Sequence, residues 1–174
     1  MIIFLVGFMG CGKSTIGRRI ARRLGYGFVD TDSVVEDKAG KRITDIFAGS
    51  GEDEFRRLET EAIEELPEGE DIVVATGGGL PCFGDNLGLM KSKGLLVYFK
   101  MRHEMLFGRL KGGRERRPKL AGVDDARHME YVRETLAQRE PYYAQASMVI
   151  DCNGVSDEYI ASHISRLIEA SGHE

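Results

Sequence analysis

The feature that most constrains this chain is an uninterrupted G-x-x-x-x-G-K-S segment that runs from Gly7 to Ser14. An apolar run, Ile2–Val6, precedes it, and a helical pattern over Lys13–Leu24 follows it. This strand–loop–helix order is the context that a phosphate-binding loop requires. Glycines let successive backbone N–H groups converge on phosphates, and the start of the helix adds its positive dipole end. The alternative is a Gly-rich turn that matches by chance, but the flanking elements disfavour it. We therefore expect the chain to bind a nucleoside triphosphate.

Two side chains of this loop are suited to phosphate chemistry. Lys13 can reach the β- and γ-phosphates of a bound nucleotide, and the Ser14 hydroxyl can ligate Mg²⁺. The loop therefore predicts both a nucleotide site and a magnesium site.

Length and charge bound the other possibilities. The chain has 174 residues, which predicts a single domain, 1–174, with a substantial buried core. Its net charge of −4 argues against nucleic-acid binding as a main role. Positive charge is nevertheless concentrated, because residues 100–119 carry eight Lys or Arg residues and only two Glu residues. We expect this segment to bind a small anion rather than a polyanion.

The apolar runs and the cysteines indicate the compartment. No apolar run approaches the length that crosses a membrane, and Met1 to Val6 lacks the basic start of a signal peptide, so we expect neither a membrane segment nor a targeting peptide. Cys11, Cys82 and Cys152 are an odd number without C-x-x-C spacing, which predicts free thiols rather than disulfides or a zinc site. We expect a monomer in the cytoplasm.

Strand-like and helix-like segments alternate along the chain. The expected strands are Ile2–Val6, Phe28–Asp30, Ile72–Thr76, Leu95–Phe99 and Met148–Ile150. The expected helices are about Lys13–Leu24, Asp32–Ala39, Asp53–Leu66, Gly84–Lys93, Met105–Leu110, Asp125–Tyr143 and Ser156–Ala170. Continuous apolar strands indicate a parallel sheet that is buried on both faces. The pattern predicts an α/β fold, a three-layer sandwich around a five-stranded parallel sheet.

Ligands of such sheets bind beyond the carboxyl ends of the strands. Besides the phosphate loop, the segments at this edge are Asp30-Thr31-Asp32 after the second strand and Gly77-Gly78-Gly79 after the third. A basic, Gly-flanked segment without periodicity, about residues 112–124, predicts a mobile lid over a charged ligand.

Asp30 and Asp32 alternate along an extended segment, so they face different ways unless the strand ends between them. In one arrangement Asp30 faces the water ligands of Mg²⁺ and Asp32 faces an acceptor hydroxyl. In the other, Asp32 only caps the helix that begins at Ser33. The nearby phosphate loop favours the first arrangement.

Three consecutive glycines have no packing value and a high entropic cost. At the ligand edge of a sheet, Gly77 to Gly79 therefore indicate backbone N–H groups that approach a substrate closely, although a simple flexible turn is the alternative. Arg56 and Arg139 lie in helical patterns, where solvent exposure or the helix dipole would account for them without any function.

Taken together, the motifs resemble those of the shikimate kinase family, small P-loop kinases of the aromatic amino-acid pathway. The matching segments cover nearly the whole chain in the family's order and are Gly7–Gly17, Phe28–Asp32, Ile43–Phe47, Gly51–Arg56, Ala75–Gly79, Arg117–Pro118 and Arg139–Tyr143. The resemblance implies an NMP-kinase-like P-loop fold with a mobile lid and a substrate-binding helical region at about residues 32–61. It also implies ATP-dependent phosphorylation of the shikimate 3-hydroxyl, with Mg²⁺ as cofactor and ATP and shikimate as the only partners.

The resemblance further implies a role for each matching residue. The catalytic residues would be Asp32, which takes the proton of the acceptor hydroxyl, Lys13, and Arg117, which neutralises charge on the transferring group. Mg²⁺ would be held by Ser14 directly and by Asp30 through water. The nucleotide-binding residues would be Gly10, Cys11, Gly12, Lys13, Ser14, Thr15 and Arg117. The substrate-binding residues would be Asp32, Arg56, Gly77, Gly78, Gly79 and Arg139, with the two arginines on the substrate carboxylate.

Departures and alternatives remain. Arg116 stands beside Arg117, so either arginine could point inward, and the segment from Asp151 to Gly154 lacks the adenine-contacting arginine of some members.

A related kinase such as gluconate kinase is the alternative enzyme, but residues 33–40 contain no histidine, which that family's pattern requires. A nucleotide-dependent switch would need an aspartate at the end of the third strand, where Thr76 and Gly77 stand. The intact set of charged site residues argues against an inactive sensor.

Overall fold

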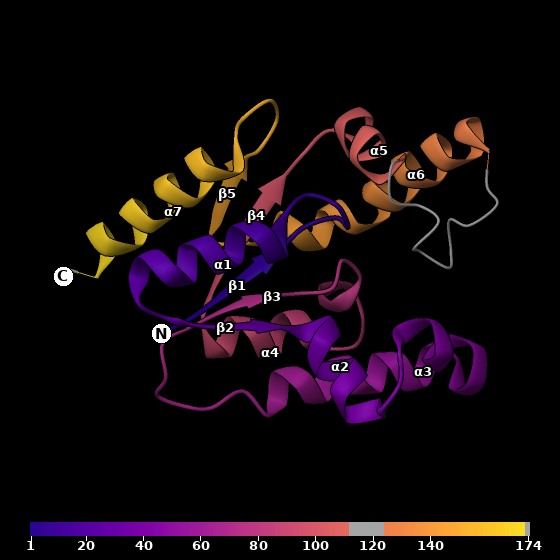
Figure 1. The fold of residues 1–174 in the computed structure, drawn as a ribbon, viewed down its shortest axis with the longest axis horizontal. Coiled ribbons are helices and arrows are strands. Elements are labelled where there is room, and N and C mark those ends of the chain that lie inside the picture. Colours follow the sequence, from indigo (N-terminus) through magenta and orange to yellow (C-terminus); the bar gives the residue numbers. More distant parts are fainter. Residues whose placement is uncertain (112–123, 173–174) are drawn as a thin grey trace.

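The computed structural model describes residues 1–111 and 124–172, and a five-stranded sheet forms its centre (Figure 1). Its strands are β1 Ile2–Val6, β2 Gly27–Asp30, β3 Ile72–Ala75, β4 Leu95–Lys100 and β5 Met148–Asp151. They lie in the order β2-β3-β1-β4-β5, and every neighbouring pair is parallel. The predicted α/β fold with a five-stranded parallel sheet is confirmed.

The phosphate loop follows the central strand β1, so it lies at the middle of the edge formed by the carboxyl ends of the strands. β1 pairs with β3 on one side and with β4 on the other, and all five of its residues are buried. A strand with two neighbours and two covered faces has no solvated side, which explains its uninterrupted apolar sequence. The loop that follows Val6 therefore emerges between the ends of β3 and β4.

The helices cover both faces of the sheet. They are α1 Lys13–Leu24, α2 Thr31–Ala39, α3 Ile43–Glu64, α4 Asn86–Lys93, α5 His103–Lys111, α6 Asp125–Tyr143 and α7 Asp157–Ser171, with a short 3₁₀ turn, η1, at Leu80–Cys82. Helices α1 and α7 pack together on one face, and α4 lies on the other (Figure 1). Helices α2 and α3 pack against each other beyond the β2 edge (Figure 1). Among the described residues, no helix is long and apolar enough to cross a membrane.

Helix α3 begins at Ile43, ten residues before the expected start at Asp53, and Gly51 interrupts its helical geometry with φ 80° and ψ 177°. The apolar period that predicted this helix is clear only after the kink. Its first part is helical because it packs with α2, where Ile46 and Val35 are fully buried in a small core separate from the main one. That tertiary contact is invisible to a local pattern.

The predicted lid is almost entirely outside the described residues, because 112–123 are not described, and Arg116 and Arg117 fall there. All three cysteines lie within the described residues and are free thiols, as expected. Cys11 and Cys152 are buried, whereas Cys82 is partly exposed.

Candidate active site

The phosphate loop is shaped by glycines that adopt positive φ angles. Gly10 has φ 82° and Gly12 has φ 98°, values that side-chain-bearing residues rarely adopt. Gly12 is the N-cap of α1, and the first helical hydrogen bond runs from the Ile16 N–H to the Gly12 carbonyl. The N–H groups of Lys13, Ser14 and Thr15 have no acceptor within the helix, so they remain available to an anion at the positive end of the helix.

Lys13 lies at the centre of this loop with only 8% of its surface exposed. Its ammonium group donates hydrogen bonds to the carbonyls of Gly7, at 2.7 Å, and Phe8, at 2.9 Å. These carbonyls hold the charge inside the curl of the loop, where phosphates of a nucleotide would meet it.

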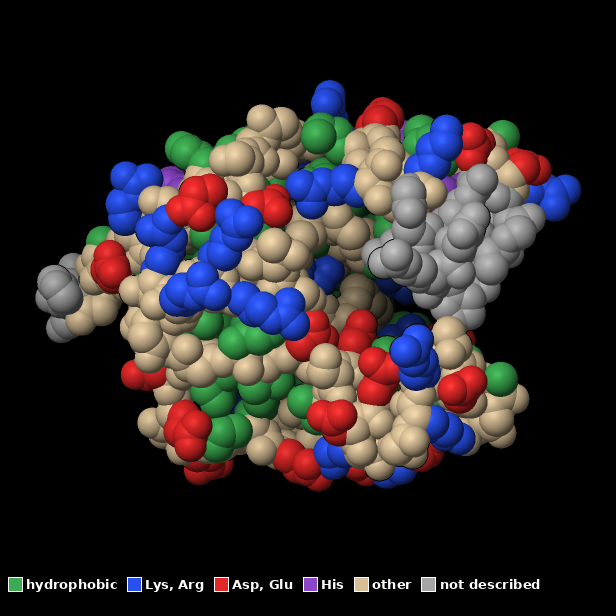
Figure 2. Space-filling view, in the orientation of Figure 1, with side chains coloured by type: hydrophobic (Ala, Val, Ile, Leu, Met, Phe, Trp, Pro, Cys, Tyr) green, Lys and Arg blue, Asp and Glu red, His purple; other side chains and the backbone are tan. Residues whose placement is uncertain are grey.

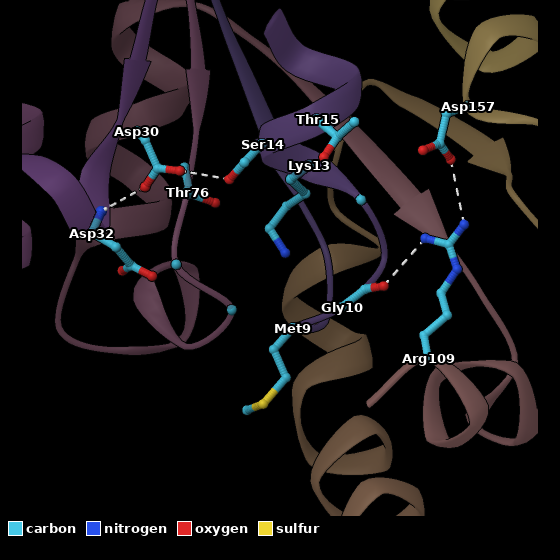
Figure 3. A pocket seen from close by; sticks show the side chains of 13 residues that line it. Met9, Gly10, Lys13, Ser14, Thr15, Asp30, Asp32, Thr76, Arg109 and Asp157 are labelled. Atoms are coloured by element: carbon cyan, nitrogen blue, oxygen red, sulfur yellow. Dashed lines mark hydrogen bonds and ion pairs between the residues drawn. The ribbon is translucent and has the colours of Figure 1, made fainter. Parts of the chain in front are cut away.

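Ser14 and Asp30 form an oxygen pair beside the loop. The Ser14 hydroxyl donates to Asp30 Oδ2 at 2.5 Å, and Asp30 Oδ1 accepts from the Asp32 N–H at 3.0 Å (Figure 3). Asp30 is therefore the N-cap of α2, so the alternative in which Asp32 caps this helix is wrong. Capping fixes the Asp30 carboxylate against Ser14, and the strand ends between the two aspartates.

Asp32 lies in the first turn of α2 and is turned toward the pocket (Figure 3). Burial raises the pKa of its carboxyl to about 6, with a further rise from the negative charge of Asp30, while Lys13 and Arg56 act in the opposite direction. A carboxylate with this pKa is ionised at neutral pH and is a stronger base than an ordinary aspartate.

The first glycine of the Gly77–Gly79 loop makes room for two carboxylates. A methyl group on Gly77 would lie 2.8 Å from Glu59 Oε1 and 2.9 Å from Asp32 Oδ1, closer than carbon atoms approach such oxygens. The Gly77 N–H donates to Thr31 Oγ1 at 3.0 Å. This N–H is therefore used within the protein, and Gly77 contributes space rather than a free donor.

The second and third glycines make room for the two predicted arginines. A methyl group on Gly78 would lie 3.3 Å from Arg139 Nη1, and one on Gly79 would lie 2.8 Å from both terminal nitrogens of Arg56. The loop after β3 thus brings together side chains from α2, α3 and α6. A loop of larger residues would push these charges apart.

Arg56 and Arg139 differ in their partners. Arg56 donates to Glu59 Oε2 at 2.6 Å and to Glu52 Oε1 at 3.3 Å, and its guanidinium lies 3.8 Å from the ring centroid of Phe83. Nη1 of Arg139 is buried and finds no acceptor within residues 1–111 and 124–172, and the same holds for Nε of Arg56. A buried guanidinium N–H without an acceptor is costly unless a ligand supplies one, so Arg139 marks an anion site.

Glu59 is a site residue that sequence reasoning missed. It is 1% exposed, and burial raises the pKa of its carboxyl to about 7, although the adjacent Arg56 lowers it. The sequence signal that could have indicated Glu59 is its position directly after Leu58, on the buried stripe of α3. A charged side chain on an apolar helix face needs a partner.

Arg109 is a second residue that was missed. From α5 it donates to the Gly10 carbonyl and to Asp157 Oδ1, both at 3.3 Å, across the pocket from Asp32 (Figure 3). The sequence signal was its place in the basic segment 100–119, which we expected to bind a small anion.

These groups surround a pocket of about 540 Å³, and the surface is hollowed there with acidic and basic side chains at its rim (Figure 2). Its lining is Met9, Gly10, Gly12, Lys13, Ser14, Thr15, Asp30, Asp32, Thr76, Gly77, Gly78, Arg109 and Asp157. Most of the predicted site residues are among them. Arg56, Gly79 and Arg139 stand next to this lining around the glycine loop, whereas the Cys11 side chain is buried in the core.

The fold and the site define a class. A phosphate loop at the end of a central parallel strand, facing a carboxylate and an arginine with a buried N–H that lacks an acceptor among the described residues, is typical of a P-loop kinase for a small anionic acceptor. The shikimate kinase family model matches residues 9–169, and the chain belongs to the shikimate kinase family.

Individual relatives agree with this assignment. The chain is 38% identical to the shikimate kinase of Bacteroides thetaiotaomicron over 168 residues, covering 96% of each protein. It is 38% identical to that of Moorella thermoacetica, covering 97% of this chain and 94% of the relative. Two solved structures are closely similar to this one. One is the Bacteroides thetaiotaomicron enzyme, with TM-score 0.91, 35% identity and coverage of 97% and 98% of the two chains. The other is the Acinetobacter baumannii enzyme in complex with shikimate, with TM-score 0.89, 34% identity and coverage of 99% and 95%.

Proposed function

We propose that this pocket is where the chain carries out the reaction of its family. That reaction is transfer of the γ-phosphoryl group of ATP to the 3-hydroxyl of shikimate, which gives shikimate 3-phosphate in aromatic amino-acid (chorismate) biosynthesis. The observation that carries the placement is an ionised Asp32 across from the phosphate loop together with Arg139 beside Gly78, because Nη1 of Arg139 has no acceptor among the described residues. The bound shikimate in the Acinetobacter baumannii relative supports the same acceptor. Full-length similarity to shikimate kinases does not favour the gluconate kinase alternative.

Asp32 is the proposed base. Its carboxylate stands between the second-strand edge and the glycine loop, where an acceptor hydroxyl can reach both it and the phosphate loop. With a pKa of about 6 it accepts the hydroxyl proton as the phosphoryl group arrives.

Arg139 and Arg56 are the proposed carboxylate contacts. Arg139 has an N–H without an acceptor among the described residues, and a planar guanidinium binds a carboxylate with two parallel hydrogen bonds. Arg56 is already oriented by Glu59, so it can add charge without a search through side-chain conformations. The backbone at Gly78 and Gly79 lies directly beside these two guanidinium groups.

The loop from Gly10 to Thr15, with Lys13 at its centre, is the proposed phosphate site. Arg109 lies beside Gly10 and is well placed to contact the nucleotide from the α5 side. Arg117 is proposed to neutralise the transferring phosphoryl group, as the family resemblance implies, and it lies outside the described residues.

Mg²⁺ is the proposed cofactor. Ser14 and Asp30 fit it, because they place two hard oxygen atoms 2.5 Å apart beside the phosphate loop. Mg²⁺ in kinases takes one or two such protein oxygens, keeps several waters and binds substrate phosphates. When bound, it neutralises charge on the phosphate oxygens.

We further propose that the protein is a monomer and that it works in the cytoplasm. The three free thiols support a reducing compartment.

The test is acceptor-dependent ATP consumption by the purified protein with Mg²⁺. ADP release should be rapid with shikimate, and neither gluconate nor a nucleoside monophosphate should replace it. Equal turnover with gluconate, or rapid turnover without any acceptor, would contradict the proposal.

A further inference from the structure

Tyr143, the last residue of α6, makes a polar contact that the proposed reaction does not use. Its side chain is fully buried, and its hydroxyl donates to the Gly78 carbonyl at 2.5 Å, across 65 residues of sequence. The contact therefore ties the end of α6 to the glycine loop after β3.

The hydroxyl is not needed for packing. The Tyr143 ring packs on Tyr98 with centroids 5.2 Å apart, and a phenylalanine ring would fill the same space. Burial raises the pKa of Tyr143 well above its usual range, although Arg139 acts in the opposite direction through its charge and a side-chain hydrogen bond, so the hydroxyl stays neutral and keeps its proton. A buried hydroxyl costs free energy unless it is hydrogen-bonded, and here its partner is the Gly78 carbonyl.

Holding this carbonyl also fixes the next N–H group. The peptide unit between Gly78 and Gly79 is planar and trans, so the Gly79 N–H points opposite to the Gly78 carbonyl. Since the carbonyl is directed at Tyr143 in the core, the Gly79 N–H is directed away from the core. Gly79 is the residue over which the Arg56 guanidinium lies.

Tyr143 also belongs to the same helix as Arg139. The two residues are four positions apart, which places them on one face of α6. Arg139 Nη1 stands against Gly78, the residue whose carbonyl Tyr143 holds. The end of α6 thus contacts Gly78 through two side chains, those of Arg139 and Tyr143.

We propose that Tyr143 is a positioning residue for the acceptor site, which orients the Gly78–Gly79 peptide and keeps it in register with Arg139. This inference rests on the proposed function, because it assumes that shikimate binds at Gly78, Gly79 and Arg139. Without the hydroxyl, the peptide can rotate and the Gly79 N–H loses its fixed direction.

The test compares Tyr143→Phe with Tyr98→Phe. Both variants remove one buried hydroxyl and keep the ring, but the Tyr98 hydroxyl donates to Glu140 instead of the glycine loop. For Tyr143→Phe we expect the KM for shikimate to rise about threefold to tenfold, as for the loss of one hydrogen bond, with the KM for ATP unchanged. Tyr98→Phe should leave both KM values near wild type. The rise in Tm that saturating shikimate produces should shrink only in Tyr143→Phe, which provides an equilibrium measurement independent of turnover.

The outcomes separate this inference from the proposed function. Equal changes in the two KM values of Tyr143→Phe, or a lowered Tm with a normal KM for shikimate, would show a structural role only and overturn the inference. If Arg139→Lys weakens shikimate binding while Tyr143→Phe does not, the positioning role fails and the acceptor site stands. If the wild-type protein does not phosphorylate shikimate, the proposed function itself fails.

Discussion

The proposed nucleotide side of the pocket comes mainly from one continuous segment, Gly7 to Thr15, whereas the proposed acceptor side is assembled from segments that are far apart in sequence. The first relies on backbone N–H groups, a helix start and one lysine held by loop carbonyls. The second relies on charged side chains from α2, α3 and α6 around the Gly77–Gly79 loop. A site within one segment forms as soon as that segment folds, but a site of separate segments needs the tertiary structure complete. We therefore expect the two sides to respond independently to substitution.

Asp32→Asn, at the junction of the two sides, should have the largest effect. The amide cannot accept the hydroxyl proton, so kcat should fall about 100-fold to 10,000-fold, with ATP binding retained. Because Asp30 is the cap of α2, and because the raised pKa means that the ionised Asp32 carboxylate opposes folding above pH 6, the Tm at pH 8 should be no lower than wild type. Asp37→Asn, at an exposed position of the same helix, is the control. Near-normal turnover of Asp32→Asn would require another base.

The same residue predicts a pH dependence in the wild-type protein. The proposed base Asp32 can accept a proton only when ionised, so kcat/KM for shikimate should fall as the pH drops through about 6. Glu59→Gln should keep this fall in kcat/KM at low pH, because the substitution removes only the neighbouring carboxyl group, which has a pKa of about 7. Loss of this fall in Glu59→Gln would assign it to Glu59 instead.

Lys13→Met should damage the nucleotide side alone. It removes the charge from the β- and γ-phosphates and keeps an apolar stem, so turnover should fall about 100-fold to 1,000-fold in a folded protein. Shikimate binding without nucleotide, measured by calorimetry, should stay within about twofold of wild type. A large loss of shikimate affinity would mean that the two sides are coupled through the loop, and the comparison would fail.

Arg139→Lys should have the smallest effect and should damage the acceptor side alone. Lysine keeps the charge but loses the planar pair of donors, so shikimate binding should weaken by about 1 to 3 kcal/mol with ATP binding unchanged. Arg133→Lys, at an exposed position of α6, is the matched control. A change mainly in kcat would instead place Arg139 on the transferring phosphoryl group.

The same contrast explains what the sequence could and could not predict. The nucleotide side followed from a contiguous motif, and all five strands were placed within one residue because each is a short, apolar or β-rich run. On the acceptor side, Arg56 and Arg139 were ordinary helical arginines until the family resemblance singled them out. Thr31 and Tyr143 lie inside matching segments but received no role, and Glu59 was only a charge on an apolar helix face, because the importance of all three comes from contacts with the Gly77–Gly79 loop across long sequence separations.

The three glycines after β3 also limit how the protein can be re-engineered. A methyl group at any of these positions would lie within 3.1 Å of another atom, in two cases the charged end of a site residue. The side of the pocket that they form cannot be thickened to exclude shikimate or to fit a smaller acceptor without displacing the charged groups that we propose to bind it. Attempts to change acceptor preference therefore have to start from other residues of the pocket lining, among which the partly exposed Met9 has a flexible side chain.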